Sequence, residues 1–170
     1  SSEPIPNGIL ALHDNGIIQD VIDPAKHSDL PENVRKLDGF LTPGFVNTHC
    51  HLELSHLKER FEQKKGLVSF IDQMRQNRGG DAVLEAIEKA DREMQENGIV
   101  AVGDISNNEL SILTKKKSSI FYHTFVEIFD VVPGRAEKAF KAGVELLSNF
   151  TTADLSASLA PHAPYTVTPE

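Results

Sequence analysis

From residue 45 onward the chain alternates between segments typical of buried strands and segments with the period of helices. The clearest helix is predicted over residues 81–97, with Asp81 as its N-cap and Gly98 at its end. Strands that alternate with helices form parallel sheets covered by those helices, so this order predicts an α/β fold. The expected strands are 45–49, 99–105, 119–129 and 155–160, and the expected helices are 67–78, 81–97, 107–116 and 134–150.

A small β segment is predicted ahead of this alternation. Over residues 8–22, two apolar runs flank Asn15-Gly16, and Asn-Gly is a strong signal for the tight turn of a hairpin. Residues 24–33 are polar and contain two prolines, which is typical of a loop. A short strand is expected at residues 34–37.

Composition and charge exclude several classes of protein. The net charge of −8 disfavours nucleic-acid binding, which needs a basic surface. No apolar run approaches the ~20 residues that cross a bilayer, and no signal segment opens the chain. Cys50 is the one cysteine, so no disulfide forms within the chain, which fits a reducing compartment. We expect a cytoplasmic protein that binds neither nucleic acid nor membrane.

Two histidines, His49 and His51, stand at the end of the first expected strand after the Pro43-Gly44 turn. Side chains alternate along a strand, so both imidazoles should share one face while Cys50 points to the helices. Such a pair suits a divalent ion, although two structural histidines give the same pattern and catalytic zinc usually has three protein ligands. Active sites of βα barrels lie at the carboxyl ends of strands, which favours the metal site.

His162 follows the last expected strand, between Pro161 and Pro164. It is either a loop histidine held by prolines or a pocket histidine that the prolines make rigid. Three polar residues follow the histidine pair on the next loop, namely Glu53, Ser55 and His56. Each of them either contacts substrate or is solvated.

Asp104 and Glu127 lie near strand ends, where each either lines a pocket or hydrogen-bonds a loop. His123 is mid-strand and is expected to be packed, whereas the lysines 115–117 are expected on a solvated surface.

Two segments resemble a known family. PGFVNTHCHLELSHL resembles the first-strand motif of the amidohydrolase superfamily, and APHAPYTVTPE resembles the fourth-strand segment of its deaminase and chlorohydrolase branch. That branch includes S-adenosylhomocysteine, aminofutalosine and guanine deaminases and triazine hydrolases. The two motifs in this order are more specific together than either is alone.

The resemblance implies an architecture. Residues 41–170 are expected to be the N-terminal half, about four βα units, of a TIM-type (β/α)8 barrel that stops before strand five. Residues 1–40 are expected to be part of the small β-sandwich domain that accompanies such barrels. Thr168 to Glu170 resemble the start of a helix, which also suggests truncation.

The resemblance also implies roles for individual residues. His49 and His51 match the two first-strand metal ligands, and His162 matches a histidine that contacts substrate. The remaining ligands and the proton-transferring groups of the family are expected beyond Glu170. The segment 155–162 lacks the strand-four lysine that bridges two metals in other branches, and this favours a single divalent ion. We expect that ion to be zinc, with iron as the alternative.

The function implied is that of a metal-dependent hydrolase acting on C–N bonds other than peptide bonds. The leading hypothesis is hydrolytic deamination of an amino-substituted heterocycle or nucleoside by metal-activated water. The alternatives are another C–N or C–Cl hydrolysis, or a non-catalytic scaffold. The segment alone is expected to be inactive, because half a barrel leaves strand edges that need the rest of the barrel, from residues beyond 170 or another chain.

Overall fold

The structure is a computed structural model that describes residues 3–61, 64–76 and 82–168. The chain divides into two compact units, Ser1–Thr42 and Pro43–Glu170. In the first unit, β1 (Ile9–Leu12) and β2 (Ile18–Ile22) form an antiparallel hairpin, as predicted. Gly16 takes a positive φ of 82° in its turn, a conformation that glycine adopts without steric cost.

The strand expected at residues 34–37 is wrong, because those residues have no regular structure and pair with no strand. Val34 and Leu37 are exposed, so no packing rewards an extended conformation there. An apolar residue at every third or fourth position is too weak a signal to specify a strand without a partner.

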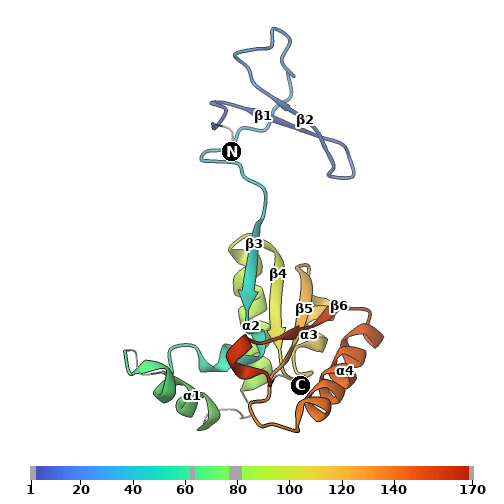
Figure 1. The fold of residues 1–170 in the computed structure, drawn as a ribbon. Coiled ribbons are helices and arrows are strands. Elements are labelled where there is room, and N and C mark those ends of the chain that lie inside the picture. Colours follow the sequence, from blue (N-terminus) through green and yellow to red (C-terminus); the bar gives the residue numbers. More distant parts are fainter. Residues whose placement is uncertain (1–2, 62–63, 77–81, 169–170) are drawn as a thin grey trace. The chain divides into compact units, whose positions relative to one another are not determined.

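The second unit contains a four-stranded parallel sheet in the order β3-β4-β5-β6 (Figure 1). The predicted α/β fold with a parallel sheet is therefore confirmed. The strands are β3 (Phe45–Cys50), β4 (Ile99–Ser106), β5 (Phe121–Ile128) and β6 (Ser156–Pro161). The helices are α1 (Gly66–Gln76), α2 (Val83–Glu96), α3 (Ile112–Lys117) and α4 (Ala136–Thr152), with 3-10 turns η1 (Leu52–Leu57) and η2 (Pro164–Thr166).

Helix ends differ slightly from the prediction. α2 has Ala82 as its N-cap, while the predicted cap Asp81 lies outside the described residues, as do positions 77 and 78 at the predicted end of α1. Gly98 follows α2 with a φ of 76° and ends the helix as predicted. α3 begins five residues later than expected, at Ile112, because residues 107–111 form bends and turns.

One face of the sheet forms the core with the helices. Val102 and Tyr122 pack there with Val83 and Ile87 of α2, and with Leu52 of η1. Burying such side chains stabilises the fold by roughly 1.5–3 kcal/mol each. None of the helices in the described part of the chain is long and apolar enough to cross a membrane.

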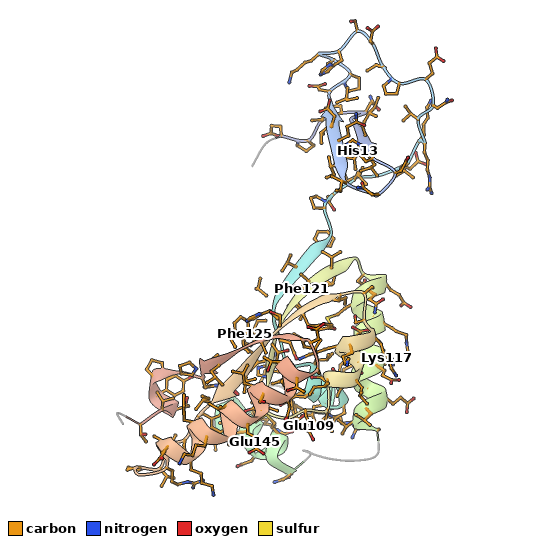
Figure 2. The ribbon with its side chains drawn as sticks, turned by 90° about the vertical axis from the view of Figure 1, so that its right-hand side faces the viewer. His13, Glu109, Lys117, Phe121, Phe125 and Glu145 are labelled. Carbon is orange, nitrogen blue, oxygen red and sulfur yellow. The ribbon has the colours of Figure 1, made fainter. Side chains whose placement is uncertain are left out.

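The opposite face of the sheet carries the alternate residues of the same strands. Phe121 and Phe125 of β5 project on the side away from α2 (Figure 2), and Phe121 is 62% exposed. His123, between them on this face, hydrogen-bonds through Nδ1 to Ser156 Oγ at 2.8 Å and through Nε2 to Ser158 Oγ at 3.0 Å. It is thus half-buried and packed, as predicted for a mid-strand histidine.

Candidate metal and substrate site

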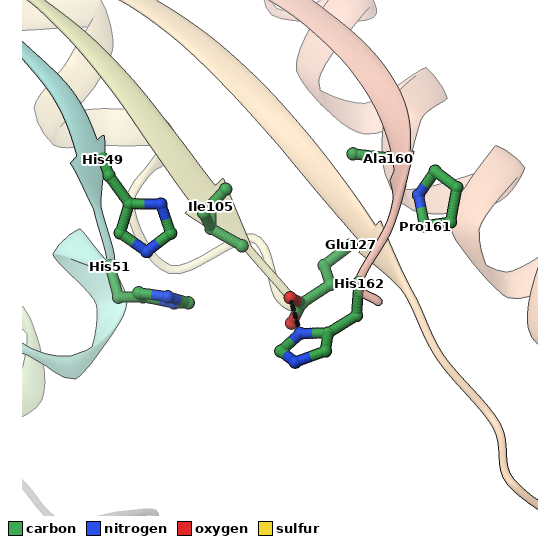
Figure 3. A pocket seen from close by; sticks show the side chains of 7 residues that line it. All are labelled: His49, His51, Ile105, Glu127, Ala160, Pro161 and His162. Atoms are coloured by element: carbon green, nitrogen blue, oxygen red, sulfur yellow. Dashed lines mark hydrogen bonds and ion pairs between the residues drawn. The ribbon is translucent and has the colours of Figure 1, made fainter. Parts of the chain in front are cut away.

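A cavity of about 150 Å³ lies at the carboxyl ends of the strands. Every strand of the sheet contributes to its wall, either directly or through the residue that follows it. Figure 3 shows the rings of His49 and His51 facing Glu127 and His162 across this space. The lining residues are His49, His51, Ile105, Glu127, Ala160, Pro161 and His162. The sheet therefore gathers histidines and a carboxylate from segments far apart in the sequence.

The imidazoles of His49 and His51 converge, with ring centroids 5.2 Å apart. Within the described part of the chain, the buried Nδ1 of His51 has no hydrogen-bond partner. Burial lowers the pKa of His51, against the opposing effect of Glu127. The lowered pKa favours the neutral imidazole, which is the form that binds metals. The pair therefore fits the first two ligands of a divalent ion, whereas no described group of three or more His, Cys, Asp or Glu side chains could hold one.

The pairing of β3 with β4 is irregular beside His49, and we call this register shift the bulge. Asn47 pairs with Val102 and Cys50 pairs with Asp104. The pairing thus advances by three residues along β3 and by two residues along β4. The Asn47 side chain supports the bulge, because its Oδ1 accepts a hydrogen bond from the His49 backbone N–H at 3.3 Å. Cys50 packs on the helix side against the core, as strand alternation predicted.

Gly103 makes room for this bulge. A Cβ atom at position 103 would lie 2.9 Å from the carbonyl oxygen of Thr48 and 3.2 Å from the Phe125 ring. The backbone of β3 therefore approaches β4 where β4 has no side chain, a common use of glycine inside a strand.

Asp104 fixes the backbone directly after His51. Its Oδ1 accepts a hydrogen bond from the Leu52 N–H at 2.7 Å, and its Oδ2 lies 2.6 Å from Lys115 Nζ. Of the two alternatives for this carboxylate, the structure supports the hydrogen bond to a loop.

The expectation that lysines 115–117 are solvated is wrong for Lys115, which is 3% exposed. One face of the short helix α3 turns inward, so Lys115 also donates to Thr124 Oγ1 at 2.8 Å, whereas Lys116 and Lys117 are exposed. Burial lowers the pKa of Lys115, against the opposing effect of Asp104. The sequence signal was the helical period, which places Lys115 one turn after the buried Ser111.

His162 lies in the cavity with Glu127. Its Nδ1 contacts Glu127 Oε1, and its backbone N–H donates to the Ile128 carbonyl at 3.0 Å. The other carboxylate oxygen of Glu127 accepts a hydrogen bond from Asn107 Nδ2 at 3.0 Å. For His162 and Glu127, the structure thus supports the pocket alternative, while a role in binding substrate stays a prediction.

Glu53 and His56, predicted to bind substrate, do not line the cavity. Glu53 is 4% exposed, and its carboxylate accepts hydrogen bonds from the backbone N–H groups of Asn107 at 2.9 Å and Asn108 at 3.1 Å. Burial raises the pKa of Glu53, and these two donors oppose that rise. His56 is half-buried within η1. Sequence reasoning missed Asn107, whose position just past the end of a strand was the available signal.

Comparison with known proteins identifies the family of the chain. Residues 40–170 match the model of the Amidohydrolase family, and the chain belongs to that family. A curated adenosine deaminase from Helicobacter pylori is 32% identical over 132 residues, which cover 75% of this chain and 32% of that protein. The predicted resemblance to the superfamily and its deaminase branch is thereby confirmed.

Solved structures superpose on the chain. The crystal structure of Helicobacter pylori aminofutalosine deaminase in complex with methylthio-coformycin gives a TM-score of 0.62 at 29% identity, covering 74% of this chain and 31% of that one. Atrazine chlorohydrolase TrzN from Arthrobacter aurescens TC1 complexed with zinc gives 0.57 at 15% identity, covering 75% and 36%, and this likeness concerns the fold alone. The chain spans about a third of the length of these relatives.

Proposed function

We propose that this chain supplies two metal ligands, His49 and His51, to a metal-dependent deaminase of amino-substituted heterocycles or nucleosides. The observation that carries the proposal is the convergence of these imidazoles with His162 and Glu127 in one cavity at the strand ends. The deaminases among its relatives support the type of reaction.

The proposed architecture is half of a (β/α)8 barrel. The strands β3 to β6 would be its first four, and residues 1–40 would belong to a β-sandwich domain. The edges of β3 and β6 and the exposed Phe121 would then be covered by the rest of the barrel, from residues beyond 170 or from another chain. The groups that complete the metal site and move protons are assigned to that remainder.

The mechanism assigns binding and orientation to the residues of this chain. His49 and His51 would hold one divalent ion, zinc rather than iron, and when bound this ion would lower the pKa of a water molecule toward neutrality. His51 favours its neutral form through burial and so stays available as a ligand. His162, held by Glu127, would orient the small-molecule substrate in the cavity. Hydrolysis would break the ring-carbon to amine bond, put the oxygen of water on that carbon and release the amine as ammonia.

An ammonia-release assay on the full-length protein tests this proposal. The substrates are aminopurine nucleosides and amino-substituted triazines and pyrimidines, supplied before and after metal removal by a chelator. His49→Ala and His51→Ala should lower kcat/KM by more than about 100-fold, since changes to groups behind a metal ligand already cost 10–100-fold. His27→Ala, at an exposed loop position, is the matched control. Turnover of these substrates without release of ammonia, or activity that survives both substitutions, would contradict the proposal.

A further inference from the structure

A chain of hydrogen bonds links the carboxyl ends of all four parallel strands. It runs from Glu53 after β3 to Asn107 after β4, then to Glu127 in β5 and His162 after β6. The first link joins Glu53 Oε2 to the Asn107 backbone N–H at 2.9 Å, and the second joins Asn107 Nδ2 to Glu127 Oε2 at 3.0 Å. Two members, Glu127 and His162, line the cavity.

Asn107 is the middle of this chain, and its own position is fixed from behind. The Glu53 carboxylate holds the N–H groups of both Asn107 and Asn108, and Glu53 is almost fully buried. Hydrogen bonds from backbone groups to a buried carboxylate are among the stronger ones in proteins. The amide of Asn107 is thereby presented to Glu127 by a backbone with little freedom to move.

Glu127 uses its two oxygens in different directions. One accepts from Asn107 and the other contacts His162 Nδ1. An ionised carboxylate only accepts hydrogen bonds, so its contact with Nδ1 favours the His162 tautomer that carries the hydrogen on that nitrogen. In the neutral ring, Nε2 is then a hydrogen-bond acceptor. Such a nitrogen selects a substrate that presents an N–H or O–H group to it.

We propose that Asn107 is a positioning residue that holds Glu127 so that the carboxylate fixes His162 as the Nδ1–H tautomer. His162 then recognises a hydrogen-bond donor on the substrate. The substrate part of this inference rests on the proposed function, whereas the tautomer does not. Of the described residues that line the cavity, Glu127 is the one to which the Asn107 side chain is hydrogen-bonded, so the effect of Asn107 is exerted through that carboxylate.

Nitrogen-15 NMR of the histidine side chains in the full-length protein reads the tautomer directly. At mildly alkaline pH, wild-type His162 should carry its hydrogen on Nδ1. In Asn107→Ala and Asn107→Asp, which both remove the donor to Glu127, the ring should become a mixture of tautomers. With an amino-substituted compound that the protein deaminates, KM should rise about tenfold and kcat should change less, as expected for one charge-assisted hydrogen bond that orients a binding group.

Asn149→Ala is the matched control, because Asn149 Nδ2 donates to Glu109 Oε2 at the same distance of 3.0 Å on the exposed surface. It should leave both the tautomer and KM unchanged. A wild-type His162 with its hydrogen on Nε2 would overturn the proposal. So would Asn107 variants that lose thermal stability but keep the wild-type tautomer, because Asn107 would then be only structural. A full-length protein that releases no ammonia would refute the proposed function while the NMR result still decides this inference.

Discussion

The side chains of Lys115 and Asp104 form an ion pair with both partners fully buried, Nζ lying 2.6 Å from Oδ2. The same carboxylate holds the Leu52 N–H at 2.7 Å, one residue after His51. Behind the cavity wall, the pair thus joins α3 and β4 to the segment that carries the proposed metal ligands. Because the ion pair is buried away from water, loss of either partner would leave an uncompensated charge and lower the stability of the fold.

Lys115→Met should lower the free energy of unfolding by about 3–5 kcal/mol, because it leaves the Asp104 carboxylate buried without its partner. Urea denaturation of the full-length protein measures this change. The neighbouring Lys116 is exposed, so Lys116→Met is the matched control and should stay within about 0.5 kcal/mol of wild type. If the two substitutions changed the free energy of unfolding equally, the buried ion pair would contribute no more to stability than an exposed lysine.

Gly103→Ala should weaken metal binding, because its methyl group would stand 2.9 Å from the Thr48 carbonyl and push the bulge that aims His49. We expect a loss of about tenfold or more in zinc affinity, the lower end of the cost of disturbing groups around metal ligands. Calorimetric zinc titration of the metal-stripped full-length protein measures it, with circular dichroism to check folding.

The control for this change is Ala101→Gly, two residues earlier in β4 on the same face. It weakens the strand by roughly 0.5–1 kcal/mol without adding an atom near Thr48. If both substitutions lower zinc affinity alike, strand stability rather than the bulge sets the position of His49.

Tyr122 should make the fold sensitive to alkaline pH. Burial raises the pKa of its phenol above the ordinary 10.0, and its hydrogen bond to Asp91 Oδ1 at 2.7 Å acts in the same direction. A raised folded-state pKa gives stability that is complete below pH 10 and is lost as pH rises further, by up to about 1.4 kcal/mol per pH unit. Unfolding free energies of wild type and Tyr122→Phe, measured by urea denaturation across this range, should therefore converge above pH 10. Parallel curves would refute this assignment.

The sequence predicted the elements whose signals are local and repetitive. The β3 to β6 strands and α2 followed from periodicity, and strand alternation placed Cys50 on the core side, opposite the cavity-lining His49 and His51. Periodicity counts residues along one strand, so it could not reveal the bulge, which depends on how β3 registers against Gly103 of the next strand.

Charged residues were the main source of error. Lys115 and Glu53 were expected to face solvent or substrate, because charged side chains are seldom buried. Each is buried here with a partner distant in sequence, Asp104 for Lys115 and the backbone of Asn107 for Glu53. Such pairings form when separate elements pack together, so the helical period that marks the inward face of α3 does not identify Asp104 as the partner of Lys115.

Anomalous X-ray scattering at the zinc edge, from crystals of the full-length protein grown with zinc, shows whether His49 and His51 bind the metal. We expect a zinc peak at bonding distance, about 2.0–2.1 Å, from one imidazole nitrogen of His49 and one of His51. A zinc peak bound elsewhere, with these two rings uncoordinated, would contradict it.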